Sequence, residues 1–118
     1  MKIKANGITI NYQIDVPENA NASAPWLVFS NSLATSLAMW DEQVEALKDS
    51  YRVLRYDQRG HGATDVPAGR YAYDTLLTDA LGLLDALSIP KAHFAGLSMG
   101  GATALGVTIR RPELVIFR

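Results

Sequence analysis

The stretch "KAHFAGLSMGGATAL" (residues 91–105) places a serine between glycines, at the point where strand-forming residues give way to helix-forming ones. Gly96, Ser98 and Gly100 match G-x-S-x-G, the pattern of a sharp strand-to-helix turn that lifts a serine hydroxyl above a sheet. Glycines on either side let the helix pass close to the strand. The helix amino terminus then directs its N–H groups and dipole at a reacting carbonyl. The stretch therefore predicts a nucleophilic Ser98.

A glycine-rich turn that cradles phosphate is the alternative interpretation. Neither G-x-G-x-x-G nor G-x-x-x-x-G-K-[ST] fits this stretch, and no lysine follows Ser98. A second glycine-rich loop surrounds His61, but Asp65 stands where the third glycine of a dinucleotide-binding fingerprint would be. A loop after a strand accounts for those glycines, so no cofactor is expected.

Short apolar runs alternate with helical periodicity along the whole chain, which predicts an α/β fold. A hairpin is expected first, with its turn at Asn6-Gly7 and the isoleucines of its second arm on one face. The other expected strands are 26–29, which we place centrally in the sheet, 51–57, 91–96 and 113–118.

Three helices are expected between these strands. The first is capped by Ser36 and carries Trp40, Val44 and Leu47 at helical spacing. The third runs from Ser98 to about Arg110. The second has an inward stripe of Leu76, Ala80, Leu83, Leu84 and Leu87. Alternating strands and helices predict a mainly parallel sheet with helices on both faces, edged by the antiparallel hairpin.

Composition excludes several classes of function. The 118 residues fit one domain, and 11 Lys+Arg against 12 Asp+Glu give a net charge of −1, without the basic stripe of a nucleic-acid-binding protein. The absence of cysteine excludes disulfides and thiolate metal sites, and fits a cytoplasmic location. No apolar run approaches the roughly 20 residues that span a bilayer, so neither a membrane nor a nucleic acid is an expected partner.

The chain resembles the amino-terminal half of the α/β-hydrolases, and most of all the 3-oxoadipate enol-lactonases. The segments that carry the resemblance are "NGITINYQID" (6–15), "PWLVFSNSL" (25–33), "MWDEQVEALKDSYRVLRYDQRGHGATDVP" (39–67), "LLDAL" (83–87) and "AHFAGLSMGG" (92–101). The resemblance implies hydrolysis of a carboxylic ester or lactone, such as the enol-lactone that yields 3-oxoadipate. It also implies that neither a metal nor an organic cofactor is needed.

The resemblance also supplies the oxyanion hole. Aligning Asn31-Ser32-Leu33 with the His-Gly-x loop of such hydrolases makes the main-chain N–H of Leu33 the partner of the Met99 N–H. A polar loop that only caps the first helix is the alternative. Two residues depart from the family pattern: Ala34 stands where glycine is usual, and Thr64 replaces the customary serine. Residues 102–118 depart further, which weakens the assignment of a substrate.

The acid and the histidine that would complete a catalytic triad with Ser98 are the missing part of the pattern. In this fold the acid and the histidine follow the nucleophile in the chain, yet only Glu113 and no histidine follow Ser98. The resemblance thus implies a single incomplete hydrolase core over residues 1–118, without lid or later strands. His93 lies on the strand before Ser98, about 16 Å away at ~3.3 Å per residue, and is expected to be structural. His61 shares the rim of the elbow and is the possible base in an oligomer.

An uncovered last strand predicts self-association. Such an edge pairs with another strand, and a two-fold homo-oligomer would hide the apolar surface and bring His61 toward Ser98 of another copy. Two functions follow: an ester or lactone hydrolase, or a non-catalytic hydrolase fragment that acts as a folding or assembly unit. Arg55 and Arg59 are candidates for attracting a carboxylated lactone, with ordinary surface or loop-anchoring roles as the alternative.

Overall fold

A computed structural model describes residues 1–17, 24–69 and 71–116. Within these residues five strands form one mixed sheet in the order β1-β2-β4-β3-β5. The strands are β1 (Lys2–Ala5), β2 (Ile8–Asp15), β3 (Trp26–Ser30), β4 (Arg52–Tyr56) and β5 (His93–Gly96). β3 pairs in parallel with both β4 and β5, whereas β1 and β2 are antiparallel. The predicted mainly parallel core with an antiparallel amino-terminal edge is therefore confirmed.

The amino-terminal hairpin turns where the sequence predicts. Asn6 and Gly7 have φ angles of 50° and 79°, the left-handed pair that suits a two-residue hairpin loop. Ile8 and Ile10 are buried, while Tyr12 and Ile14 pack on the edge of the same apolar cluster. Because β2 is twice as long as β1, its second half is free to pair with β4 and joins the hairpin to the parallel strands.

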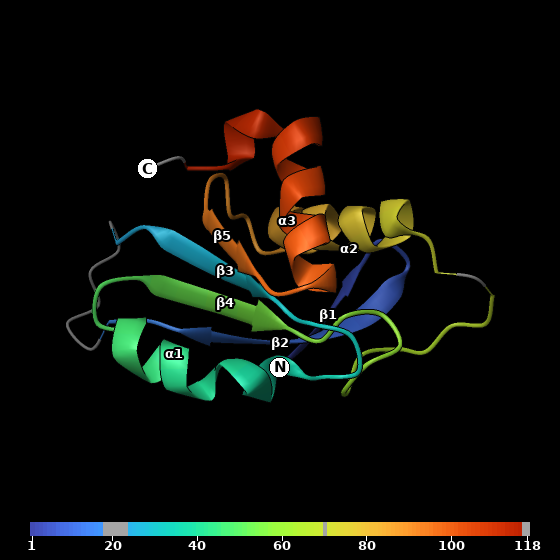
Figure 1. Cartoon of the computed structure of the whole chain (residues 1–118), viewed down its shortest axis with the longest axis horizontal. Coiled ribbons are helices and arrows are strands. Elements are labelled where there is room, and N and C mark those ends of the chain that lie inside the picture. Colours follow the sequence, from blue (N-terminus) through green and yellow to red (C-terminus); the bar gives the residue numbers. More distant parts are fainter. Residues whose placement is uncertain (18–23, 70, 117–118) are drawn as a thin grey trace.

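Helices cover both faces of the sheet (Figure 1). On one face lie the 3₁₀ helix η1 (Leu37–Trp40) and α1 (Asp41–Leu47); on the other lie α2 (Tyr73–Ala86) and α3 (Met99–Arg110). The smaller core, under α1, consists of Leu27, Phe29, Val44 and Val53. The larger core joins β2, β3 and β4 to α2 and α3. The predicted helices are present, and the first begins as a 3₁₀ turn capped by Ser36, whose hydroxyl accepts from the Ala38 N–H at 3.4 Å.

The prediction of a strand over 113–118 is wrong for its first residues. Pro112–Leu114 form a 3₁₀ helix, η2, because proline is favoured at the start of a helical turn. Val115 then makes an isolated parallel bridge with Ala92, and residues 117–118 lie outside the described residues. Among the described residues, β3 pairs with β5 along one side, and on the other side the bridge at Ala92 lies one residue before the strand. Among the described residues no helix is long and apolar enough to cross a bilayer.

Candidate active site

Ser98 occupies the predicted turn and has an unusual backbone. It is the N-cap of the 12-residue helix α3, with φ 56° and ψ −112°. A positive φ is uncommon for any residue but glycine, and such strain concentrates at functional sites. The turn is fastened to the end of β3, since the Leu97 N–H donates to the Ser30 carbonyl at 3.3 Å. Ser98 is exposed beyond the carboxyl end of β5.

The two glycines of the motif allow backbone to touch backbone. A Cβ on Gly100 would lie 1.9 Å from the Ser30 carbonyl oxygen, and a Cβ on Gly96 would lie 2.3 Å from the Gly100 carbonyl carbon. Neither contact can relax by moving a side chain. The next glycine, Gly101, is different, because its nearest neighbour would be 3.5 Å from an added Cβ. The close packing of helix and strand predicted for Gly96 and Gly100 is therefore present.

The loop that carries the second expected oxyanion donor follows β3. Leu33 has an exposed side chain, Met99 begins α3, and within the described residues neither main-chain N–H donates a hydrogen bond. Both N–H groups are thus available to an acceptor. Ala34 has φ 61°, a left-handed conformation that explains why glycine suits this position.

The loop after β4 is held by a buried carboxylate. Asp57 accepts hydrogen bonds from the N–H of Leu37 at 2.7 Å, from Asn11 Nδ2 at 2.9 Å and from the N–H of Ala63 at 2.9 Å. A Cβ on Gly62 would lie 2.3 Å from this carboxylate. Gly62 is therefore explained by the close approach of the Asp57 carboxylate, and no cofactor is needed to account for it.

Thr64 fits the same loop without strain. Its hydroxyl donates to the Asp57 carbonyl at 2.7 Å and accepts from the Asn11 N–H at 2.9 Å. The hydroxyl that threonine shares with serine makes both hydrogen bonds. This departure from the family pattern is therefore accommodated.

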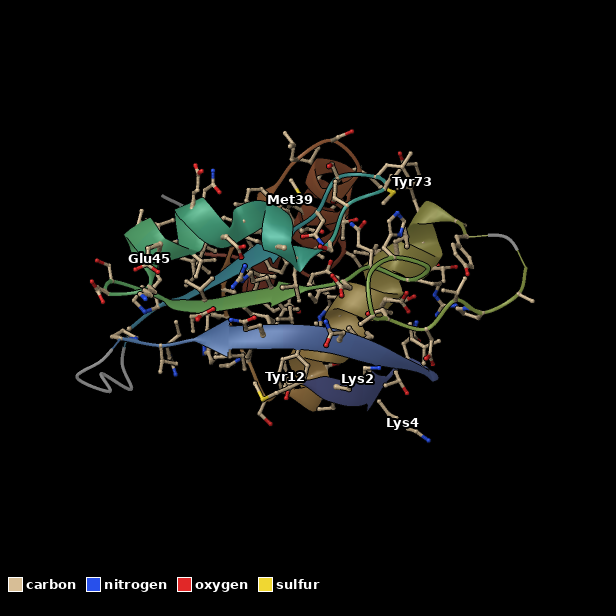
Figure 2. The ribbon with its side chains drawn as sticks, turned by 90° about the horizontal axis from the view of Figure 1, so that it is seen from below. Lys2, Lys4, Tyr12, Met39, Glu45 and Tyr73 are labelled. Carbon is tan, nitrogen blue, oxygen red and sulfur yellow. The ribbon has the colours of Figure 1, made fainter. Side chains whose placement is uncertain are left out.

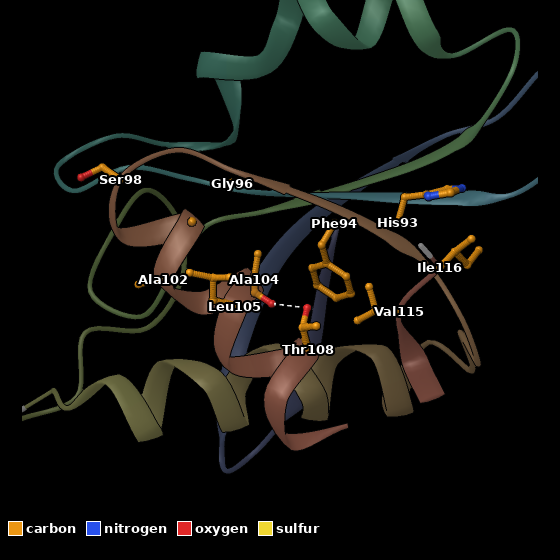
Figure 3. A pocket seen from close by; sticks show the side chains of 11 residues that line it. His93, Phe94, Gly96, Ser98, Ala102, Ala104, Leu105, Thr108, Val115 and Ile116 are labelled. Atoms are coloured by element: carbon orange, nitrogen blue, oxygen red, sulfur yellow. Dashed lines mark hydrogen bonds between the residues drawn. The ribbon is translucent and has the colours of Figure 1, made fainter. Parts of the chain in front are cut away.

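Neither histidine meets Ser98 within one chain. The Nδ1 atom of His61 pairs with the Arg59 carbonyl at 3.0 Å, inside its own loop. The His93 ring meets Tyr51 edge to face at 5.9 Å. Figure 3 shows His93 and Ser98 at opposite ends of the same hollow. His93 therefore packs against Tyr51 and is remote from Ser98, which fits the structural role expected for it.

The two arginines considered for a carboxylated substrate are engaged inside the protein. Arg55 is buried and forms ion pairs with Asp41 and Asp15. Arg59 donates two hydrogen bonds, at 2.8 and 2.9 Å, to the buried Asp79, and this hydrogen bonding raises the pKa of Arg59. Loop anchoring is therefore the role that the structure supports. Asp79 was not recognised in the sequence, where it looks like a polar residue of an amphipathic helix.

An open hollow of about 810 Å³ runs from Ser98 along β5 and α3 (Figure 3). We call it the β5–α3 hollow. Most of the side chains that line it are apolar, namely Phe94, Ala102, Ala104, Leu105, Val115 and Ile116, and the polar ones are His93, Ser98 and Thr108. β5, which pairs with β3, and α3 form two walls of the hollow, and Val115 and Ile116 close its far end. The candidate nucleophile thus stands at the end of an apolar surface.

The family follows from a match to known proteins. A family model for the alpha/beta hydrolase fold matches residues 25–115, so this chain belongs to the α/β-hydrolase fold family. Among curated relatives, 3-oxoadipate enol-lactonase 1 of Acinetobacter baylyi is 53% identical over 103 residues, which are 87% of this chain and 37% of that protein. 3-Oxoadipate enol-lactonase 2 of the same organism is 45% identical over 111 residues, 94% of this chain and 40% of that protein.

A solved structure points the same way. The enol-lactonase from Burkholderia xenovorans LB400 superposes with a TM-score of 0.92 at 46% identity, over 98% of this chain and 44% of that one. The chain therefore spans about 40% of the length of the curated relatives it matches. Its resemblance to enol-lactonases is borne out over the amino-terminal part of those enzymes.

Proposed function

We propose that Ser98 is the nucleophile of a serine hydrolase that acts on carboxylic esters or lactones. The observation that carries the proposal is the strained backbone of Ser98, with φ 56°, at the amino terminus of α3. Strain of this kind is retained where it presents a reactive group, and here it accompanies two glycines packed against neighbouring backbone. Membership of the hydrolase family supports the same reaction class.

The chemistry of this site is acyl transfer. The Ser98 Oγ attacks the carbonyl carbon of the ester or lactone, and its proton passes to a base. The carbonyl oxygen becomes an oxyanion that accepts hydrogen bonds from the N–H groups of Leu33 and Met99. When the tetrahedral intermediate collapses, the ring oxygen leaves and a proton is returned to it; water then hydrolyses the acyl-serine.

An enol-lactone is the substrate class we propose, because the relatives named above are enol-lactonases and the sequence follows them from the hairpin to the elbow. In such a ring the leaving oxygen departs as an enol, which tautomerises to a ketone. The two arginines are occupied by carboxylates of the protein. Recognition of a substrate carboxylate is therefore not assigned to them.

The base is proposed to come from a second copy of the chain. Within one chain His61 is bonded to its own loop, whereas the hollow beside β5 offers a face for a two-fold homo-oligomer. Such an arrangement would bring His61 of one copy to Ser98 of the other. The same hollow also supports the alternative function, a non-catalytic assembly unit. In that case two copies associate through the hollow and Ser98 takes part in no reaction.

Labelling with a fluorophosphonate tests both possibilities. We expect an adduct on the wild type, read by intact mass, and none on Ser98→Ala. Mixing Ser98→Ala with His61→Gln should restore labelling that neither variant shows alone, and sedimentation should show an oligomer. A folded wild-type chain that sediments as an oligomer and forms no adduct would support the assembly unit instead. Labelling of a sedimenting monomer would remove the second copy from the mechanism.

A further inference from the structure

We propose that Gln58 and Trp40 are positioning residues for the oxyanion loop: they hold Asn31 and so fix the main-chain N–H of Leu33 relative to Ser98. The inference rests on the proposed function, since it assigns a task to the Leu33 N–H. It adds two side chains that the G-x-S-x-G motif and the oxyanion alignment do not contain.

Asn31 anchors the loop, and it is held by η1, by the end of β4 and by the loop that follows β4. Its side chain is 1% exposed, and its Oδ1 accepts from Trp40 Nε1 at 2.8 Å. Its Nδ2 donates to the Tyr56 carbonyl at the end of β4, also at 2.8 Å. Its main-chain carbonyl accepts from Gln58 Nε2 at 3.0 Å. Both the side chain and the backbone of Asn31 are thus fixed two residues before Leu33.

The same carbonyl also touches the nucleophile elbow. A Cβ on Gly100 would come within 2.7 Å of the Asn31 carbonyl oxygen, so the first turn of α3 packs directly on this group. Holding Asn31 therefore holds the loop against the helix that begins at Met99. Both N–H groups must point at one oxyanion, and a misplacement of about 1 Å can cost roughly 100-fold in rate.

Stability alone is a poor explanation for Gln58. The residue is 3% exposed, and its Oε1 is buried with no protein donor among the described residues. A buried acceptor without a partner is unfavourable, whereas leucine would fill the same space without that oxygen. Residues that break a local rule of stability are expected where they serve a site. The Nε2 donor to Asn31 is the feature that leucine could not supply.

The hydrogen bond of Trp40 can be removed while an aromatic ring is kept at the same position. Its ring stacks on Phe29 with centroids 4.4 Å apart, which places the indole against the smaller core. Trp40→Phe keeps an aromatic ring there and removes the Nε1–H that Asn31 Oδ1 accepts. Gln58→Leu keeps the volume and removes the Nε2 donor. Ile89→Val is the matched control, because Ile89 is a buried residue of the larger core that precedes the amino end of β5, whereas this loop follows the carboxyl end of the parallel strand β3.

The first measurement is the backbone order of the two donors by ¹⁵N relaxation, with urea unfolding in parallel. We expect the order parameter of Leu33 to fall from about 0.85, the value of a rigid backbone, to below about 0.6 in Gln58→Leu and Trp40→Phe. The order parameter of Met99 should change little in both variants. The urea midpoint of Gln58→Leu should also change little. Ile89→Val should lower the midpoint and leave Leu33 ordered.

An unchanged order parameter of Leu33 in both variants would overturn the inference, and so would an equal loss of order in Ile89→Val. If Gln58→Leu fails to fold, Trp40→Phe decides. The second measurement is the rate of fluorophosphonate labelling, expected to fall roughly 10- to 100-fold in both variants. A wild type without adduct would refute the proposed nucleophile, while the order of Leu33 would still decide whether Gln58 and Trp40 hold the loop.

Discussion

The two edges of the sheet are finished differently. β1 carries Lys2 and Lys4, both exposed, and Figure 2 shows Lys4 reaching outward from this edge. β5, at the other edge, contains no lysine, arginine, aspartate or glutamate, and the apolar β5–α3 hollow lies beside it. Charged side chains on an edge strand discourage pairing with other strands. The comparison teaches that β1 is suited to solvent and β5 to being covered.

The candidate nucleophile follows β5, the edge strand beside the hollow. Ser98 is therefore positioned from the inner side of β5 alone, through the Leu97 N–H bonded to Ser30 and through the contact of Gly100 with β3. On the outer side, among the described residues, the elbow borders the β5–α3 hollow. Substitutions on the inner side should consequently lower the free energy of unfolding far more than substitutions on the outer side.

The largest effect is expected from Gly100→Ala. The added methyl would lie 1.9 Å from the Ser30 carbonyl oxygen, so β3 and α3 would have to separate. We expect a loss of at least about 3 kcal/mol in the free energy of unfolding, measured with urea, because overpacking against backbone has no soft neighbour to move.

Gly101→Ala is the matched control for that substitution. It adds the same methyl one residue later, where the nearest atom is 3.5 Å away. In a helix this replacement is expected to gain about 0.5–1 kcal/mol. Similar losses for both variants would show that the inner side of β5 is not the tighter one.

A second test of the inner side is its pH dependence. The hydroxyl of Tyr56 is buried and pairs with Ser30 Oγ at 2.9 Å. Burial raises the pKa of Tyr56 from 10 to about 12, and the hydrogen bond from Ser30 opposes part of that rise. The raised pKa contributes stability that is complete below pH 10 and is lost as the pH rises through 12.

The loss is expected to reach about 1.4 kcal/mol per pH unit between these values, because the folded state must keep a proton that the unfolded chain releases. Urea unfolding at pH 8 and pH 11 measures it as the difference between the wild type and Tyr56→Phe. The difference cancels the titration of lysines and of the other tyrosines. Parallel pH dependence of the two proteins would contradict the burial of the phenol.

On the outer side we expect almost no change in stability from Leu105→Glu. Leu105 is 66% exposed on α3 and lines the hollow, so its replacement should alter the free energy of unfolding by less than about 0.5 kcal/mol. If a second copy covers this face, the charge should weaken association about tenfold or more, measured by sedimentation. Val66→Glu, at an exposed position outside the hollow, controls for added charge. Equal association of both variants would place any interface elsewhere.

Much of the fold could be predicted because periodicity reports burial. The alternation in β2 and the stripe of α2 follow from which side chains face the core. The run 113–118 is apolar enough to predict a strand, but Pro112 favours the start of a 3₁₀ turn over its first residues. Local backbone preference decided that segment, which the apolar pattern alone does not reveal.

The site was predictable only where it is contiguous in sequence. The elbow lies within a few residues, and its glycines are explained by local geometry. The supporting contacts join distant residues: Asn11 bonds to Asp57 46 residues on, and Asn6 to Asp79 73 residues on. Such pairs leave no periodic signal, and polar residues at these positions look like ordinary loop residues. Asn31 is an example, since its burial appears only when three elements meet around it.

A small gain in stability is expected from Ala34→Gly, in the oxyanion loop itself. Ala34 is held at φ 61°, where a Cβ is unfavourable, while glycine adopts this conformation freely but loses more entropy on folding. Relief of the backbone strain slightly exceeds the extra loss of entropy, so we expect a gain of about 0.5 kcal/mol in the free energy of unfolding.

Ala46→Gly, at an exposed position of α1, is the opposite control and should lose about 1 kcal/mol, since its helical backbone gives glycine no advantage. Urea unfolding of both variants separates a specific relief of strain from a general effect of glycine. If Ala34→Gly loses as much as Ala46→Gly, the loop does not impose its left-handed conformation on residue 34. The Leu33 N–H beside it would then be less firmly placed than the contacts of Asn31 imply.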